Sequence, residues 1–133
     1  MVDKATIAPR GERALDMLAQ HPLFDMHCHL GFAADAAQIA ARAAARSEGM
    51  LSCGVDPRVY ADETTAVESA DAVRVGLGLH PWWIERVGQE GYDAFFDQLV
   101  AAAYVGEIGL DHGARHGGTF EHQQQVFREM CAA

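Results

Sequence analysis

Four short apolar stretches recur along this chain, each about as long as a buried β-strand. A proline or glycine stands within two residues of an end of each of the first three, as expected for strand boundaries. The predicted strands occupy residues 23–29, 50–55, 73–79 and 104–110. Between them, apolar side chains return at the spacing of helices.

Helices are predicted in the intervening segments. Residues 34–47 are dense in alanine, the strongest helix former, and Gly49 is the expected stop. Asp62 and Thr119 stand where the capping residues of helix N-termini are expected. The predicted helices occupy residues 11–20, 34–47, 62–70, 91–103 and 119–133.

The alternation of strands and helices favours an α/β fold with a parallel sheet and right-handed crossovers. The strands repeat at an interval typical of a βα unit. A closed (β/α)₈ barrel takes about 250 residues, and this chain has 133. We therefore predict a parallel barrel-type architecture of four βα units, about half of a TIM barrel. It would form a single domain over residues 1–133, truncated before strand five.

Composition and charge narrow the class of protein. The chain is 50% hydrophobic and 22% charged, which is ordinary for a globular domain. A formal net charge of −9 argues against tight binding to duplex DNA or RNA through charge alone. Three widely spaced cysteines lack the pattern of a disulfide framework, and no stretch resembles a signal core or a membrane span. A cytoplasmic protein is therefore expected.

Two histidines stand two residues apart at the end of the first predicted strand. Because side chains alternate along a strand, His27 and His29 share one face with Asp25, whereas Cys28 points to the other. Two imidazoles on one face can hold a metal ion, although packed histidines are an equally good interpretation of this motif alone. Asp25 is expected either to support such ligands or to be an interior polar group.

Further chemically active side chains stand at the ends of the later strands. His80 follows the third strand, Glu107 lies in the fourth, and Asp111 comes directly after it. The carboxyl ends of parallel strands meet at one rim, where α/β proteins build their active sites. Imidazole together with carboxylate suits Zn²⁺, Mn²⁺ or Fe²⁺ better than Ca²⁺. Beside this rim, Trp82 and Trp83 are interpreted as loop packing in preference to a base-stacking platform.

The motifs FDMHCHL, VGLGLHP and VGEIGLD, in this order and followed by QQQVFREM, resemble the TatD family of metal-dependent hydrolases. That family belongs to the amidohydrolase-like barrels, and the resemblance covers most of the chain. It implies that His27 and His29 ligate one metal ion and that Glu107 bridges two. It also implies that His80 lies in the active site and that Asp111 lies near the substrate, so Glu107, His80 and Asp111 are the expected catalytic residues.

The same resemblance implies a reaction, a cofactor and a substrate. The reaction is the metal-dependent hydrolysis of phosphodiester bonds, commonly as a DNase, so nucleic acid or another phosphodiester is the expected partner. Divalent metal ions are the implied cofactor, and Zn, Mn, Mg or Fe are all compatible. The family's remaining ligands, two histidines and an aspartate, follow later strands. This chain therefore supplies only the first half of the ligand set.

Two other functions stay open. The chain could be a catalytically inactive half barrel that serves binding or assembly, because half a ligand set forms an open and weak metal site. It could also be an amidohydrolase-like enzyme that acts on another type of bond, although Glu107 counts against this. A half barrel exposes two strand edges, so a homo-oligomer that covers them is expected, and no membrane partner is.

Overall fold

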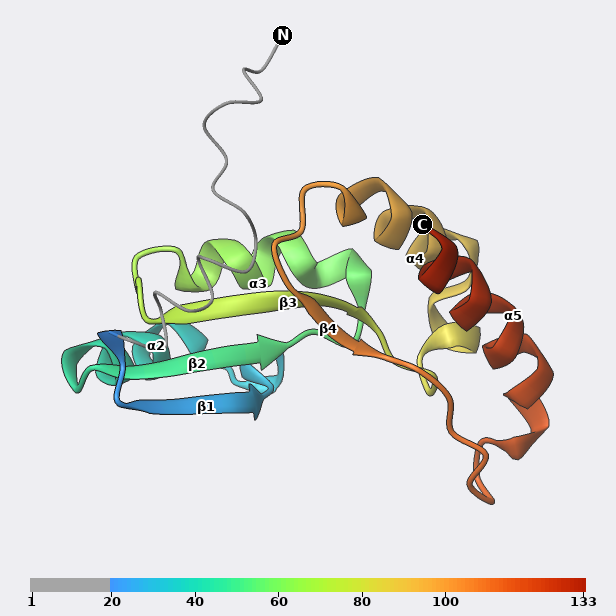
Figure 1. The fold of residues 1–133 in the computed structure, drawn as a ribbon, viewed down its shortest axis with the longest axis horizontal. Coiled ribbons are helices and arrows are strands. Elements are labelled where there is room, and N and C mark those ends of the chain that lie inside the picture. Colours follow the sequence, from blue (N-terminus) through green and yellow to red (C-terminus); the bar gives the residue numbers. More distant parts are fainter. Residues whose placement is uncertain (1–19) are drawn as a thin grey trace, which may run out of the picture.

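A computed structural model describes residues 20–133 and places four parallel strands in one curled sheet (Figure 1). The strands are β1 (Leu23–Cys28), β2 (Glu48–Cys53), β3 (Val73–Leu79) and β4 (Val105–Ile108). They are ordered β1-β2-β3-β4, so each strand pairs with the next along the chain. The predicted α/β fold, about half of a TIM barrel, is therefore confirmed. The helix predicted over residues 11–20 lies outside the described residues except for its last position.

A helix follows each strand, as right-handed crossovers between parallel strands require. The helices are α2 (Ala36–Ala45), α3 (Tyr60–Val67), α4 (Ile84–Leu99) and α5 (Phe120–Ala132). Short 3₁₀ turns precede three of them, at Leu30–Phe32, Pro57–Val59 and Gly117–Thr119. Among residues 20–133, no helix has both the length and the apolar character needed to cross a membrane.

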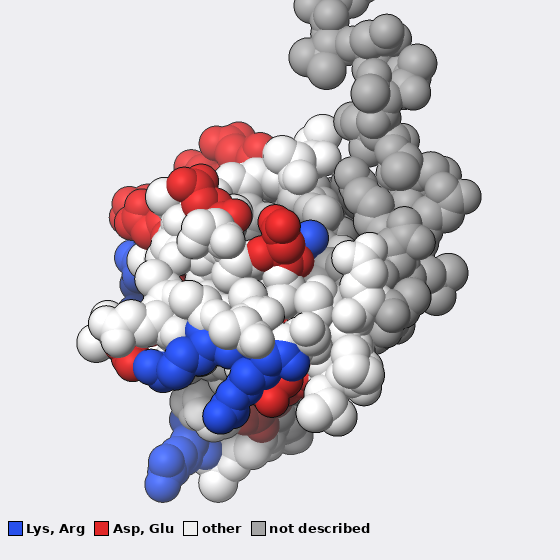
Figure 2. Space-filling model, turned by 90° about the vertical axis from the view of Figure 1, so that its left-hand side faces the viewer, with Lys and Arg blue, Asp and Glu red and all other residues white. Residues whose placement is uncertain are grey.

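Charges of both signs lie at the end of the molecule where the strands begin. Figure 2 shows acidic side chains over the upper part of this face, and basic side chains gathered along its lower part. Two arginines at the carboxyl end of α2 are paired: Arg42 lies 3.6 Å from Asp35, and Arg46 lies 4.0 Å from Glu48. Exposed pairs of this kind contribute little to stability.

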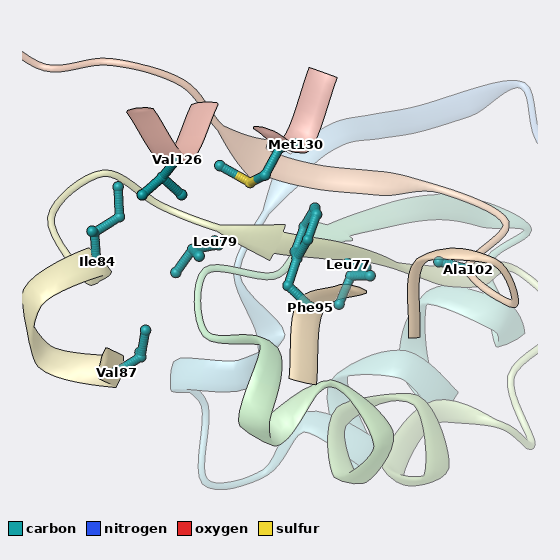
Figure 3. Close-up of a cluster of buried hydrophobic side chains, with 8 residues drawn as sticks. All are labelled: Leu77, Leu79, Ile84, Val87, Phe95, Ala102, Val126 and Met130. Carbon is teal, nitrogen blue, oxygen red and sulfur yellow. The ribbon is translucent and has the colours of Figure 1, made fainter. Parts of the chain in front are cut away.

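The core consists of two apolar clusters that share β3. One face of β3 turns Val73 and Val75 toward α2 and α3, and turns Leu77 and Leu79 toward α4 and α5. The larger cluster is drawn in Figure 3 and contains Leu77, Leu79, Ile84, Val87, Phe95, Ala102, Val126 and Met130. The smaller contains Leu30, Ala40, Val67, Ala70, Val73 and Val75. Strand β3 therefore shares a cluster with residues of all four helices.

The inner face of the sheet is closed by glycine backbones instead of side chains. A Cβ added to Gly106 on β4 would come within 2.7 Å of the backbone nitrogen of Gly54, which follows β2. The Glu107 N–H donates to the Gly54 carbonyl at 3.0 Å, across the intervening strand β3. This close approach needs residues without side chains. It carries the Glu107 carboxylate toward the end of β1.

Two local expectations are corrected by the structure. Helix α4 begins at Ile84, seven residues before the predicted start at residue 91. Its first part is interrupted at Gly88 (φ 56°, ψ −154°), and this glycine made the segment resemble a loop. Gly49 does not stop α2 but lies in β2, where an added Cβ would come within 2.3 Å of the Phe24 ring. The turn between them is made at Ser47, whose φ is 55°.

The two expected capping residues do not cap. Asp62 lies in the first turn of α3, because the helix continues the preceding 3₁₀ turn and Val59 takes the N-cap position. Thr119 does take the N-cap position of α5, but its hydroxyl donates to the His116 carbonyl at 3.0 Å. The side chain that caps is Asp56, which accepts from the Arg58 N–H at 3.0 Å and opens the 3₁₀ turn.

Candidate metal centre

The two histidines of the first strand meet at its carboxyl end. A register shift lies between Asp25 and Cys28, and the Asp25 carboxylate accepts from the His27 backbone N–H at 2.9 Å. The Nε2 atoms of His27 and His29 lie 3.2 Å apart, and their rings meet edge to face with centroids 5.0 Å apart. The predicted sharing of one side by these imidazoles is observed. Asp25 holds the main chain beneath them.

Glu107 reaches this pair from β4. Its Oε1 lies 3.1 Å from His27 Nε2, and its Oε2 lies 3.8 Å from His29 Nε2. Each of the three residues offers one ligand atom, and these atoms all lie within 4.8 Å of one another. Among residues 20–133, this is the group whose composition and spacing suit a metal ion. We call it the three-residue cluster.

The orientation of His29 fits a metal ligand. Its Nδ1 lies 2.8 Å from the Cys53 carbonyl, which can only accept a hydrogen bond. His29 therefore donates from Nδ1, and in the neutral ring Nε2 keeps its lone pair toward Glu107. Metal-bound histidines are commonly oriented by such a second hydrogen bond. The Cys53 carbonyl was not foreseen from the sequence, because it comes from a different strand.

The spacing of the nitrogens also fits one ion. Two zinc–nitrogen bonds of about 2.0–2.1 Å that meet at a tetrahedral angle separate their nitrogens by about 3.3 Å. The observed distance between His27 Nε2 and His29 Nε2 is 3.2 Å. Two imidazoles and a carboxylate suit Zn²⁺, Mn²⁺ or Fe²⁺. The donor set of the cluster thus matches a divalent transition metal.

His80 lies beside the cluster but is oriented as a hydrogen-bond donor. Its Nδ1 accepts from the Trp82 backbone N–H at 3.1 Å, so the neutral ring carries its proton on Nε2. That Nε2 lies 3.8 Å from Glu107 Oε2. Burial lowers the pKa of His80, although the charges of Glu107 and Asp111 oppose this. The result is a neutral imidazole with an N–H aimed at the cluster.

Asp111 lies at the rim but outside the three-residue cluster. Its Oδ1 accepts from the Gly113 N–H at 2.6 Å, and its Oδ2 accepts from the Trp82 indole N–H. These hydrogen bonds, that of Gly113 first, lower the pKa of Asp111. The carboxylate is therefore charged near neutral pH and holds the loop after β4 against Trp82. Its predicted proximity to substrate stays a prediction.

Gln123 holds the loop after β4 beside the cluster, and no role was predicted for it from the sequence. It is fully buried, and its Oε1 accepts from the Asp111 N–H at 2.8 Å. Its Nε2 donates to the Thr119 hydroxyl at 2.8 Å and to the His116 carbonyl at 3.2 Å. The signal was present, because Gln123 is the first glutamine of QQQVF. Its partners, however, depend on how α5 docks.

Cys28 turns away from the histidines, as the strand alternation predicted. It packs against the smaller apolar cluster, and its Sγ donates to the Leu51 carbonyl at 3.5 Å. Burial, followed by the charge of Asp25, raises the pKa of its thiol to about 11. A metal-binding cysteine must be a thiolate, so Cys28 is not arranged to ligate.

Two comparisons with known proteins bear on this site. A sequence profile of the family described as TatD related DNase matches residues 24–133, which contain the whole cluster and its surroundings. No individual curated protein matches the chain significantly. The matched segment is most of the chain, and its motifs coincide with the strand ends that meet in the structure.

Proposed function

Because this chain belongs to the TatD family of DNase-related proteins, we propose that it is a metal-dependent hydrolase of phosphodiester bonds. The observation that carries the proposal is the convergence of His27, His29 and Glu107 from two strands that are not neighbours in the sheet. The TatD family is generally metal-dependent, and these three residues offer the donor atoms for an ion. Nucleic acid, as a phosphodiester, is the proposed substrate.

In the proposed mechanism, the chain holds and orients the reactants. His27 and His29 would hold a divalent ion through Nε2, and the Cys53 carbonyl keeps the His29 ring in place. Glu107 has one carboxylate oxygen near each histidine and would help to hold the ion. A bound divalent ion supplies a nucleophilic water at neutral pH and stabilises negative charge on the phosphoryl oxygens.

His80 has a separate proposed role. Its Nε2 lies 3.8 Å from Glu107 Oε2, so its N–H is proposed to donate a hydrogen bond to an oxygen of the substrate at the cluster. Because the Trp82 N–H fixes the tautomer through Nδ1, His80 donates a hydrogen bond and is not proposed as a ligand. Asp111 is proposed to position this group indirectly, through its hydrogen bond with the Trp82 indole.

Substitution of Glu107 tests the proposal. We expect Glu107→Gln to lower metal-dependent hydrolysis of bis(p-nitrophenyl) phosphate at least about a hundredfold, because an oxyanion ligand is lost. Glu121→Gln is the matched control, since Glu121 lies exposed on α5, and it should retain the wild-type rate. Hydrolysis that persists in Glu107→Gln and in the presence of a chelator contradicts the proposal.

A non-enzymatic function is the second candidate, favoured by the open edges of the sheet. Leu23 on β1 is 66% exposed and Val105 on β4 is 48% exposed. Exposed apolar side chains at both edges are typical of surfaces that bind a partner. In that case the cluster would bind metal without turnover. The hydrolysis assay separates the two functions, because a binding or assembly module has no metal-dependent rate.

A further inference from the structure

A continuous series of aromatic rings borders the three-residue cluster on one side. Ring centroids lie 5.5 Å apart for His29 and Phe32, and 6.2 Å apart for Phe32 and Trp83. The series continues from Trp83 to His80 at 6.1 Å and from His80 to Trp82 at 5.0 Å. We call these five rings the aromatic arc. It begins at a candidate ligand and passes the proposed hydrogen-bond donor.

The two largest exposed rings of the arc are Phe32 and Trp82. Phe32 is 64% exposed and Trp82 is 50% exposed, whereas Trp83 packs against the larger apolar cluster. Loop packing is observed for both tryptophans, since Trp82 contacts Asp111 and His116 of the loop after β4, but Trp82 also keeps half of its surface exposed. Exposed aromatic rings that border a polar site are typical of binding surfaces, so these two rings are candidates for ligand contact.

Trp82 is exposed and yet firmly oriented. Its backbone N–H donates to His80 Nδ1, and its indole N–H donates to Asp111. One face of its ring stacks on His116, with centroids 4.6 Å apart and an interplanar angle of 14°. A ring held at three points loses little conformational freedom when a ligand binds, so it is preorganised for contact.

We propose that Phe32 and Trp82 bind unpaired nucleobases of the substrate by stacking, next to the phosphodiester held at the three-residue cluster. This inference rests on the proposed function and adds the residues that select the substrate. The net charge of −9 disfavours binding through phosphates, whereas stacking does not depend on net charge. Bases inside a duplex are already stacked on their neighbours, so the exposed rings select bases outside a duplex.

The test compares two ligands with the same phosphates, tetrathymidylate and an abasic tetranucleotide. Dissociation constants are measured by isothermal titration calorimetry on the full chain with chelator present, so that hydrolysis plays no part. We expect the wild-type chain to bind tetrathymidylate about a hundredfold more tightly, a ratio equivalent to about 2.8 kcal/mol and within the range for stacking of two bases. Tetrathymidylate should also quench the tryptophan fluorescence.

Single substitutions locate the effect. Phe32→Leu and Trp82→Leu should each weaken tetrathymidylate binding about tenfold without changing abasic binding, while Phe32→Tyr should bind as the wild type does. Val105→Ala is the control, because Val105 is exposed at the opposite end of a strand. Phe32 lies in an exposed turn, so its variants do not depend on the indole contacts for folding.

Two results overturn the inference: equal affinity of the wild-type chain for both ligands, or unchanged tetrathymidylate affinity in Phe32→Leu and Trp82→Leu. Neither result bears on hydrolysis, which is measured separately with Glu107→Gln. Failure of the stacking inference is therefore distinguishable from failure of the proposed function.

Discussion

Gln123 is a buried polar side chain that joins the loop after β4 to α5 through three hydrogen bonds. We expect Gln123→Leu to lower the free energy of unfolding by about 2 kcal/mol, because the buried amide is lost and the partly buried Asp111 N–H loses its partner. Gln125→Leu is the control, since Gln125 is exposed, and should change stability by less than about 0.5 kcal/mol. Urea unfolding measures both. Equal stabilities of the two variants would contradict this role.

A second residue-scale prediction concerns Asp56 and pH. Burial raises the pKa of Asp56, but hydrogen bonds from Arg58 outweigh burial and leave the pKa below its ordinary value. A carboxyl whose pKa is lowered on folding stabilises the fold above its unfolded pKa, and this contribution is lost as pH falls through the folded pKa. We therefore expect wild type to exceed Asp56→Asn in stability at neutral pH and to approach it below about pH 4.

Urea unfolding of both chains at neutral and acidic pH measures this difference. Arg42 pairs with Asp35 on the surface at 3.6 Å, so Asp35→Asn serves as an exposed control with little effect at either pH. A stability difference between wild type and Asp56→Asn that stays constant with pH would show that the charge of Asp56 is not what stabilises the turn.

At the scale of elements, glycine contacts bring β4 close enough for Glu107 to reach β1. We expect Gly106→Ala to lower the free energy of unfolding by about 1–3 kcal/mol, because the added Cβ meets rigid backbone of Gly54 and Gly76 at 2.7 Å. The same displacement should weaken metal binding, since Glu107 is the next residue. Gly118→Ala, with nothing within 4 Å, should leave both quantities unchanged. Normal metal affinity in Gly106→Ala would contradict the claim that the glycine contacts position Glu107 for metal binding.

The elements were largely predictable because their signals are local. Every second residue of β3 is apolar and buried in one of the two apolar clusters, and the bounds of the strand at Val73–Leu79 match the predicted range. The start of α4 was not predictable, since Gly88 interrupts the helical pattern while Ile84 is buried by distant elements. The histidine pair follows from strand alternation. The Cys53 carbonyl and Gln123 contacts depend on tertiary approach, which no local pattern contains.

At the scale of the whole molecule, both edges of the sheet are apolar and exposed. Leu23 and Met26 on β1 are 66% and 57% exposed, and Val105 on β4 is 48% exposed. We propose that a second copy of the chain covers these edges, because two copies related by a two-fold axis satisfy β1 and β4 of both at once. Such an assembly would bring a second three-residue cluster to the same rim.

Sedimentation velocity over a concentration series tests this assembly. Each copy carries a net charge of −9, so association should strengthen with added salt, which screens the repulsion. Met26→Lys and Val105→Lys should each weaken association, whereas a surface change on α5, Arg128→Lys, should not. A chain that sediments as a monomer at every concentration and salt condition contradicts the proposal.

The central claim is that His27, His29 and Glu107 hold a divalent metal ion. Co²⁺ titration of the full chain, followed by visible absorption, tests it most directly because ligand-field bands report bound imidazole and carboxylate without requiring turnover. We predict saturable bands in wild type, affinity reduced at least about tenfold in His29→Gln and Glu107→Gln, and wild-type affinity in His122→Gln on α5. Co²⁺ binding that is absent from wild type, or that is unchanged in His29→Gln, would contradict the claim.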